Sequence, residues 1–168
     1  MQMIRQIEDT LAGIFKDLPT LPKGGKEGLV AIFPWIALIF GIVQLSGAWG
    51  LYQLSTLTIN NFALYAAITP MEKTMVYFSI AVLLINAVIL LMAFSPLQKK
   101  ARRGWDLLFI GALINLAYAV LSIFMYSGGI GSFMSGLISS AIGFYLLFQV
   151  REYYTGSKKP IKHKSKKA

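Results

Sequence analysis

Four apolar runs, each with no charged residue in its interior, constrain the fold of this chain more than any other feature. They cover approximately residues 29–52, 74–94, 105–126 and 132–150. At 1.5 Å per residue, about twenty residues cross the ~30 Å hydrocarbon core of a bilayer. Backbone amides in lipid must be paired, so runs of this length are predicted to be transmembrane helices. The predicted fold class is therefore all-α, an integral membrane four-helix bundle over residues 29–154.

The composition is that of a membrane protein. Of the 168 residues, 56% are hydrophobic and only 14% are charged, far from the usual balance of a soluble domain. There is no cysteine, which excludes a disulfide framework, a thiolate metal site and a cysteine nucleophile. The net charge of +9 favours anionic lipid as a partner, because an excess of lysine and arginine is the expected topogenic signal of a membrane protein.

The basic residues are sorted into alternate segments between the runs. All but Lys73 of the sixteen lysines and arginines precede the first run, lie between the second and third, or follow the fourth. They are Arg5, Lys16, Lys23, Lys26, Lys99, Lys100, Arg102, Arg103, Arg151, Lys158, Lys159, Lys162, Lys164, Lys166 and Lys167. By the positive-inside rule these segments face the cytoplasm. We therefore predict a multi-pass protein of the plasma (inner) membrane with both termini cytoplasmic, whose basic residues at 99–103 and 158–167 contact anionic lipid headgroups.

Residues 1–28 are predicted to form a cytoplasmic amphipathic helix followed by a linker. Apolar side chains spaced three or four positions apart share one helix face: Ile4, Ile7, Leu11, Ile14, Phe15 and Leu18. The helix is expected to lie flat at the membrane interface with this face toward lipid, and docking on a partner protein is the alternative. Pro19, Pro22 and residues 23–26 are expected to end it and to supply a flexible elbow.

Residues 155–168 carry six lysines and almost no apolar side chain, so we predict a disordered basic tail. It is interpreted as an electrostatic tether for anionic lipid, or as a topological anchor. Nucleic acid is a less favoured partner, because no aromatic side chain is interleaved among the lysines to stack on bases.

Two connections face the other side of the membrane. Residues 53–73 are half apolar and are predicted to form a short interfacial helix. Residues 127–131 are rich in glycine and are predicted to form a tight turn, which makes the third and fourth spans an antiparallel hairpin.

Asn86 and Asn115 are polar side chains inside the predicted spans. Counted from the cytoplasmic ends of their helices they lie eight and ten residues deep, which is about 12 and 15 Å. An amide in hydrocarbon needs a partner, so the two are expected to hydrogen-bond across adjacent spans, for about 0.6–2 kcal/mol. We interpret the pair as packing, with a polar pathway or substrate pocket as the alternative. Gln44 lies nearer the outer side and is not expected to join them.

Small residues mark the expected helix contacts. In the third span Gly111 and Ala119 lie on one stripe with Asn115. In the fourth span Ser132, Gly136 and Ser140 form one series at four-residue spacing, and Ser135, Ser139 and Gly143 form another. Such stripes let helix backbones approach closely in lipid. They predict contacts within the bundle or between two copies of the chain, and both alternatives stay open.

The sequence lacks the groups that most enzymes use. Its carboxylates nearest the membrane are Glu72 and Asp106, which are predicted to lie on opposite sides of the bilayer. No nucleophile–base set, metal-ligand cluster or phosphate-binding loop is present in the sequence. We therefore expect no enzymatic activity, no cofactor and no metal.

The segments at 100–109 and 142–154 resemble stretches of a group of uncharacterised small four-span bacterial membrane proteins, typical of minimal-genome candidate phyla. The resemblance implies a bacterial inner-membrane protein without an assigned activity. We expect a non-enzymatic protein that acts by association, as a scaffold or accessory subunit. The alternative is a small oligomeric channel or transporter, in which Asn86, Asn115 and the serines of the fourth span converge on a wet cavity.

Overall fold

The computed structural model describes residues 2–15, 17–61, 69–121 and 129–156. Within these ranges the chain is helical, which confirms the predicted all-α class. The helices are α1 (Gln2–Phe15), α2 (Lys23–Asn60), α4 (Pro70–Gln98), α5 (Arg102–Leu121) and α6 (Gly129–Thr155). The last four are long and apolar enough to cross a membrane, so the chain is a multi-pass integral membrane protein.

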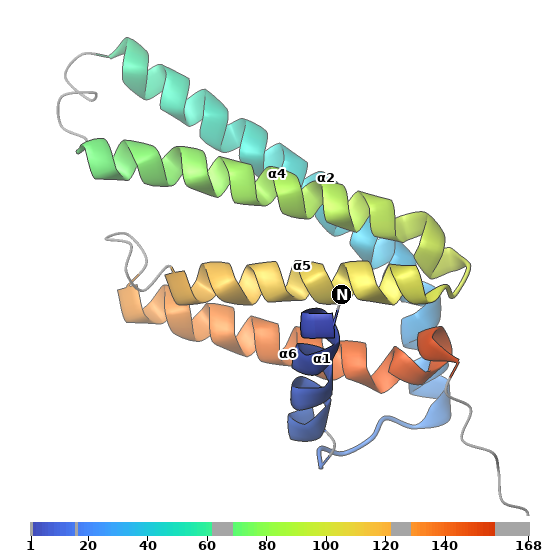
Figure 1. Ribbon diagram of the computed structural model, residues 1–168. Coiled ribbons are helices and arrows are strands. Elements are labelled where there is room, and N and C mark those ends of the chain that lie inside the picture. Colours follow the sequence, from blue (N-terminus) through green and yellow to red (C-terminus); the bar gives the residue numbers. More distant parts are fainter. Residues whose placement is uncertain (1, 16, 62–68, 122–128, 157–168) are drawn as a thin grey trace, which may run out of the picture.

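The four long helices form two antiparallel pairs, α2 with α4 and α5 with α6 (Figure 1). The pairs meet through α4 and α5, and α2 also contacts α6. Figure 1 shows that they converge where the chain turns from α4 into α5 and diverge toward the other end. We call the convergent end the basic end, because the described residues there include Lys23, Lys26, Lys99, Lys100, Arg102, Arg103 and Arg151.

The buried core lies at the basic end. Its residues come from the first turns of α2 and α5 and the last turns of α4 and α6. They are Val30, Phe33, Ala37, Ala93, Leu97, Trp105, Phe109, Phe144, Leu147, Val150 and Tyr154. The Nε1 of Trp105, a fully buried residue, donates to the carbonyl of Leu147 at 3.1 Å, which ties α5 to α6. Packing is what holds membrane helices together, so this end sets how the four spans are arranged.

The turn from α4 to α5 is a Schellman motif with an unusual residue in its left-handed position. Lys100 has a φ of 49°, its amide donates to Leu97, and the amide of Ala101 donates to Pro96. Gly104 follows in close contact with the end of α4: a methyl group there would lie 2.7 Å from the backbone nitrogen of Leu97. The glycine is therefore required for the close approach of α4 and α5.

The helices at the far end extend beyond the predicted apolar runs. The sequence placed a separate short helix within 53–73, whereas α2 continues to Asn60 and residues 62–68 lie outside the described ranges. The hydroxyls of Ser55, Thr56 and Thr58 donate to carbonyls three or four residues earlier, so polar residues are carried on a continuous helix. α4 begins with a capping box in which Thr69 and Glu72 bond each other's backbone amides. The predicted turn at 127–131 lies partly outside the described residues.

Candidate functional site at the basic end

The amphipathic helix α1 crosses α6 near the basic end, roughly perpendicular to the bundle (Figure 1). Ile4, Leu11 and Phe15 pack against the core, and the ring of Phe15 stacks on Phe148 with centroids 5.5 Å apart. Ile7, Ile14 and Leu18 are exposed large hydrophobics of the same segment. The sequence offered lipid or a partner protein as the surface beneath this helix. In the structure, part of this apolar face packs on the chain's own α6, and the rest of the face is uncovered.

A buried carboxylate fixes α1 to two transmembrane helices. Glu8 is only 2% exposed, and both of its oxygens accept from Nη2 of Arg102, at 3.2 and 2.9 Å. Arg151 of α6 also forms an ion pair with Glu8. A buried carboxylate without a cation is strongly destabilising, so Glu8 selects this docked position of α1. Sequence reasoning missed Glu8, because a carboxylate on the polar side of an amphipathic helix gives no sign of a partner 94 residues away.

The two arginines are themselves held in place by aromatic and acidic groups. Their guanidinium carbons lie 6.0 Å (Arg102) and 5.9 Å (Arg151) from the ring centroid of Trp105. Arg102 pairs with Asp106 in the next helical turn, and Arg151 pairs with Asp9 of α1, both at 3.4 Å. The cations are thus positioned at the junction of three helices.

The linker between α1 and α2 is bound to α6. Gln149 accepts from the amide of Leu21 at 3.0 Å through Oε1, and its Nε2 donates to the carbonyl of Pro19 at 3.3 Å. The hydroxyl of Tyr145 donates to the same carbonyl at 2.7 Å. The predicted flexible elbow is therefore restricted to residues 17–22, which these contacts hold. Residues 23–26 instead form the first turn of α2, which begins directly after Pro22.

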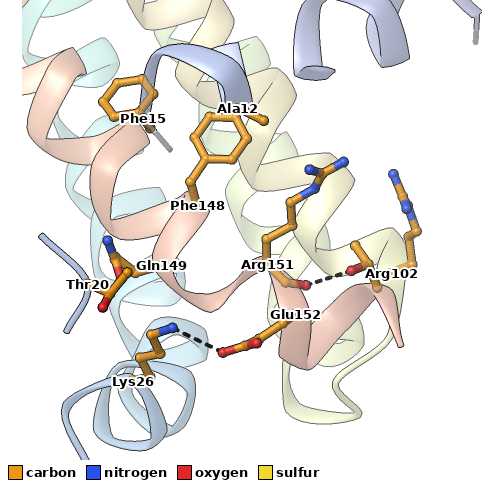
Figure 2. Close-up of a pocket in the computed structure, with 10 residues that line it drawn as sticks. Ala12, Phe15, Thr20, Lys26, Arg102, Phe148, Gln149, Arg151 and Glu152 are labelled. Carbon is orange, nitrogen blue, oxygen red and sulfur yellow. Dashed lines mark hydrogen bonds and ion pairs between the residues drawn. The ribbon is translucent and has the colours of Figure 1, made fainter. Parts of the chain in front are cut away.

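A cavity of about 530 Å³ lies between α1, the linker, and the basic ends of α2, α5 and α6 (Figure 2). Its lining residues are Ala12, Phe15, Thr20, Lys26, Arg102, Phe148, Gln149, Arg151, Glu152 and Thr155. Figure 2 shows aromatic rings on one side of this space and charged side chains on the other. Lys26 pairs with Glu152 at 3.1 Å, which joins the start of α2 to the end of α6. The site is amphipathic and carries three cations.

The predicted intramembrane amide pair is present. Nδ2 of Asn86 donates to Oδ1 of Asn115 at 3.0 Å, which confirms the expected hydrogen bond between α4 and α5. Asn86 is 1% exposed and its Oδ1 faces Gly111, where a methyl group would lie 3.0 Å away. Asn115 is exposed, so only one member of the pair is enclosed by helices.

The two small-residue series of α6 have different surroundings. A methyl group on Gly136 would lie 2.8 Å from Cβ of Ala119, so the first series contacts α5. Ser140 of that series is half-buried, and the side chain of Ser132 lies outside the described ones. Ser139 and Gly143 of the second series are exposed, and a methyl group on Gly143 would meet no described atom within 4 Å. Ser135 is also at the surface but takes part in an interaction.

The basic residues that were predicted to contact lipid headgroups differ in their exposure. Lys99, Lys100 and Arg103 are exposed at the α4–α5 turn, whereas Arg102 is engaged with Glu8. The tail lysines Lys158, Lys159, Lys162, Lys164, Lys166 and Lys167 lie outside the described residues.

No family model, curated protein or solved structure matches the chain.

Proposed function

We propose that this chain is a non-enzymatic membrane protein that acts by association, as a small scaffold or accessory subunit. Its proposed location is the plasma (inner) membrane of a bacterium, in accord with the resemblance of residues 100–109 and 142–154. The sorting of basic residues supports a cytoplasmic position for the basic end and for both termini. Anionic lipid headgroups are the proposed lipid partners on that side.

The observation that carries this proposal is the use made of polar groups in and near the membrane. Asn86 hydrogen-bonds to Asn115 and lies in close contact with Gly111. Both contacts pack α4 against α5. Of the carboxylates near the ends of the spans, Glu72 caps α4 and Asp106 pairs with Arg102. These groups stabilise the bundle, and none of them is held in a position to act on a substrate.

The exposed face of α6 supports association in the membrane. Ser139 and Gly143 lie there beside large exposed side chains, among them Met134, Ile138 and Ile142. A small-residue stripe between apolar side chains allows a second transmembrane helix to approach closely. The proposed protein partner is therefore another membrane helix, from a second copy of the chain or from a different protein.

Cysteine cross-linking tests this proposal directly, because the natural chain has no cysteine. We expect Ser139→Cys to give a covalent adduct in native membranes, either a dimer of this chain or a heteromer. The matched control is Val43→Cys on an exposed position of α2, which we expect to give no adduct. Equal yields of the adduct at both positions, or no adduct at either position, would contradict association through α6.

Transport is the second candidate, and one observation favours it. The Oδ1 of Asn86 and the Oε1 of Gln44 are buried and have no hydrogen-bond partner among the described residues. Gly41 contacts Leu91 and Gly47 approaches Leu83, so Gln44 between them lies near the depth of Asn86 rather than nearer the far end. Unpartnered polar groups within spans are typical of sites where an ion or small solute passes.

Replacing both asparagines separates the two functions. Under the association proposal, Asn86→Leu with Asn115→Leu leaves the protein inserted and its adduct through Ser139→Cys intact. Under the transport alternative, the same double variant abolishes a flux into proteoliposomes while the protein stays folded. Gln53→Leu, which removes an exposed amide near the end of α2, is the control for both readouts.

A further inference from the structure

We infer that the cavity between α1 and the basic end binds the phosphate group of a phospholipid, with part of its acyl chain against Phe15 and Phe148. This inference rests on the proposed function only in taking lipid at the basic end as a partner, and it assigns that partner a defined site. Three features carry it: the charge of the lining, its apolar side, and its position.

The charge of the lining suits one phosphodiester. Lys26, Arg102 and Arg151 come from three different helices, and Glu152 is the only carboxylate among the lining residues. Glu8 lies beneath the two arginines and removes one more positive charge. Among these five groups the surplus is one positive charge, which equals the single negative charge of a phosphodiester. Asp106 also pairs with Arg102 and Asp9 with Arg151, but their side chains are 45% and 74% exposed, so water screens both carboxylates.

The arginines keep donors for a second acceptor. The contacts described for them use Nη2 of both residues and Nε of Arg102. A guanidinium has five N–H donors, and its planar fork suits phosphate oxygens. Their attachment to Glu8 and to the face of Trp105 fixes both side chains before a ligand arrives. A prearranged cationic site loses less side-chain entropy on binding.

The apolar side of the cavity indicates a lipid rather than a free phosphate. Ala12, Phe15 and Phe148 line the same space as the cations. Ile14 and Leu18, one residue before and three residues after Phe15, are exposed. A soluble phosphate makes no favourable contact with this apolar surface, whereas an acyl chain buries it. The volume of about 530 Å³ falls in the usual range for a small-molecule site, about 300–1,000 Å³.

Native mass spectrometry of the purified full-length chain with phosphatidylglycerol measures the bound lipid directly. Lys26 and Lys23 are matched test and control residues, since both start α2 but only Lys26 lines the cavity; their side chains are 18% and 86% exposed. We expect Lys26→Gln to weaken one bound phosphatidylglycerol about tenfold, as for the loss of a charge-assisted hydrogen bond. Lys23→Gln should leave its affinity within about twofold.

A second variant tests the cavity without changing any charge. Ala12→Phe fills the space from α1, and we expect it to displace the same lipid while the arginines and Glu8 remain. Circular dichroism and gel filtration report whether each variant keeps its helices and its monodisperse state. If both lysine variants bind alike and Ala12→Phe has no effect, lipid binds only to the general basic surface and the inference is overturned.

Competition identifies the source of the phosphate. We expect millimolar inorganic phosphate and glycerol 1-phosphate to leave the bound phosphatidylglycerol in place. Displacement by either would show a site for soluble phosphate and would overturn the lipid assignment. Because the measurement uses purified protein, a failure of cross-linking at Ser139 in membranes leaves this result unaffected, and the reverse also holds.

Discussion

Glu8 and Arg102 meet across 94 residues of sequence, with Nη2 of the arginine donating to both oxygens of the carboxylate. Through this pair the first helix of the chain is fixed to the third of the four spans. The pair is enclosed on the carboxylate side and open to solvent on the guanidinium side, with side chains 3% and 39% exposed. Its strength is therefore between that of a surface ion pair and that of a fully buried one.

Removal of Glu8 is expected to destabilise the docked α1. Glu8→Ala leaves Arg102 and Arg151 facing each other without the carboxylate between them, and we expect the free energy of unfolding to fall by about 1–3 kcal/mol. Asp9→Ala removes an exposed neighbour and should change stability by less than about 0.5 kcal/mol. Thermal unfolding in detergent and limited proteolysis of the 17–22 linker measure both effects. Equal behaviour of the two variants would show that Glu8 does not hold the helix.

Substitution of Gly104 is expected to separate α4 from α5. The methyl group of Gly104→Ala would meet backbone atoms of Pro96 and Leu97, which cannot move aside as a side chain can. We expect a loss of about 1–3 kcal/mol, the usual range for overpacking. Gly50→Ala is the matched control, because that position in α2 is helical and open, and alanine there should be neutral or stabilising. Chemical unfolding in mixed micelles compares the two.

The two asparagines are expected to be energetically coupled. Asn115→Leu leaves the buried Nδ2 of Asn86 without its acceptor, and Asn86→Leu removes the hydrogen bond and also crowds Gly111. A double-mutant cycle should give a coupling energy of about 0.6–1.7 kcal/mol, the range for hydrogen bonds between membrane helices. Additive single effects within error would mean that the hydrogen bond does not contribute to stability.

Glycine at position 100 is expected to stabilise the turn. Lys100 occupies the left-handed region, which costs an L-residue about 1–2 kcal/mol, so Lys100→Gly should raise stability by about 1 kcal/mol. Lys99→Gly, one residue earlier with φ of −81°, should instead lower it slightly. The difference between the two unfolding free energies is the measurement. If both variants were destabilising to the same extent, side-chain contacts rather than backbone conformation would govern the turn.

The spans and the amide pair could be predicted because each depends on local chemistry. Charge-free runs of sufficient length must be helices in lipid, and two amides at similar depth on neighbouring spans have each other as partners. The small-residue stripes of α6 are a case in which local chemistry does not predict the helix contacts. Gly136 and Gly143 both lie in four-residue series, yet only Gly136 contacts α5. Helical periodicity defines faces but does not say which face meets a neighbour.

The docking of α1 could not be predicted, because it depends on contacts far apart in sequence. Glu8 has the ordinary appearance of a solvated residue on an amphipathic helix, and Arg102 and Arg151 that of topogenic cations. Their association requires the relative positions of α1, α5 and α6. The hydrogen bonds of Gln149 to the linker depend on the same positions, so the expected elbow is a held segment.

The attachment of α1 to α6 also sets an order of events during synthesis. Asp9 and Arg151 are separated by 142 residues, so the ribosome completes the first helix well before its docking surface exists. At about 5–20 residues per second, the interval is on the order of ten seconds. During that time the apolar face of the nascent helix lacks the surface of α6 on which Phe15 packs in the folded protein. The helix made first can therefore reach its docked position only after the last transmembrane helix has been made.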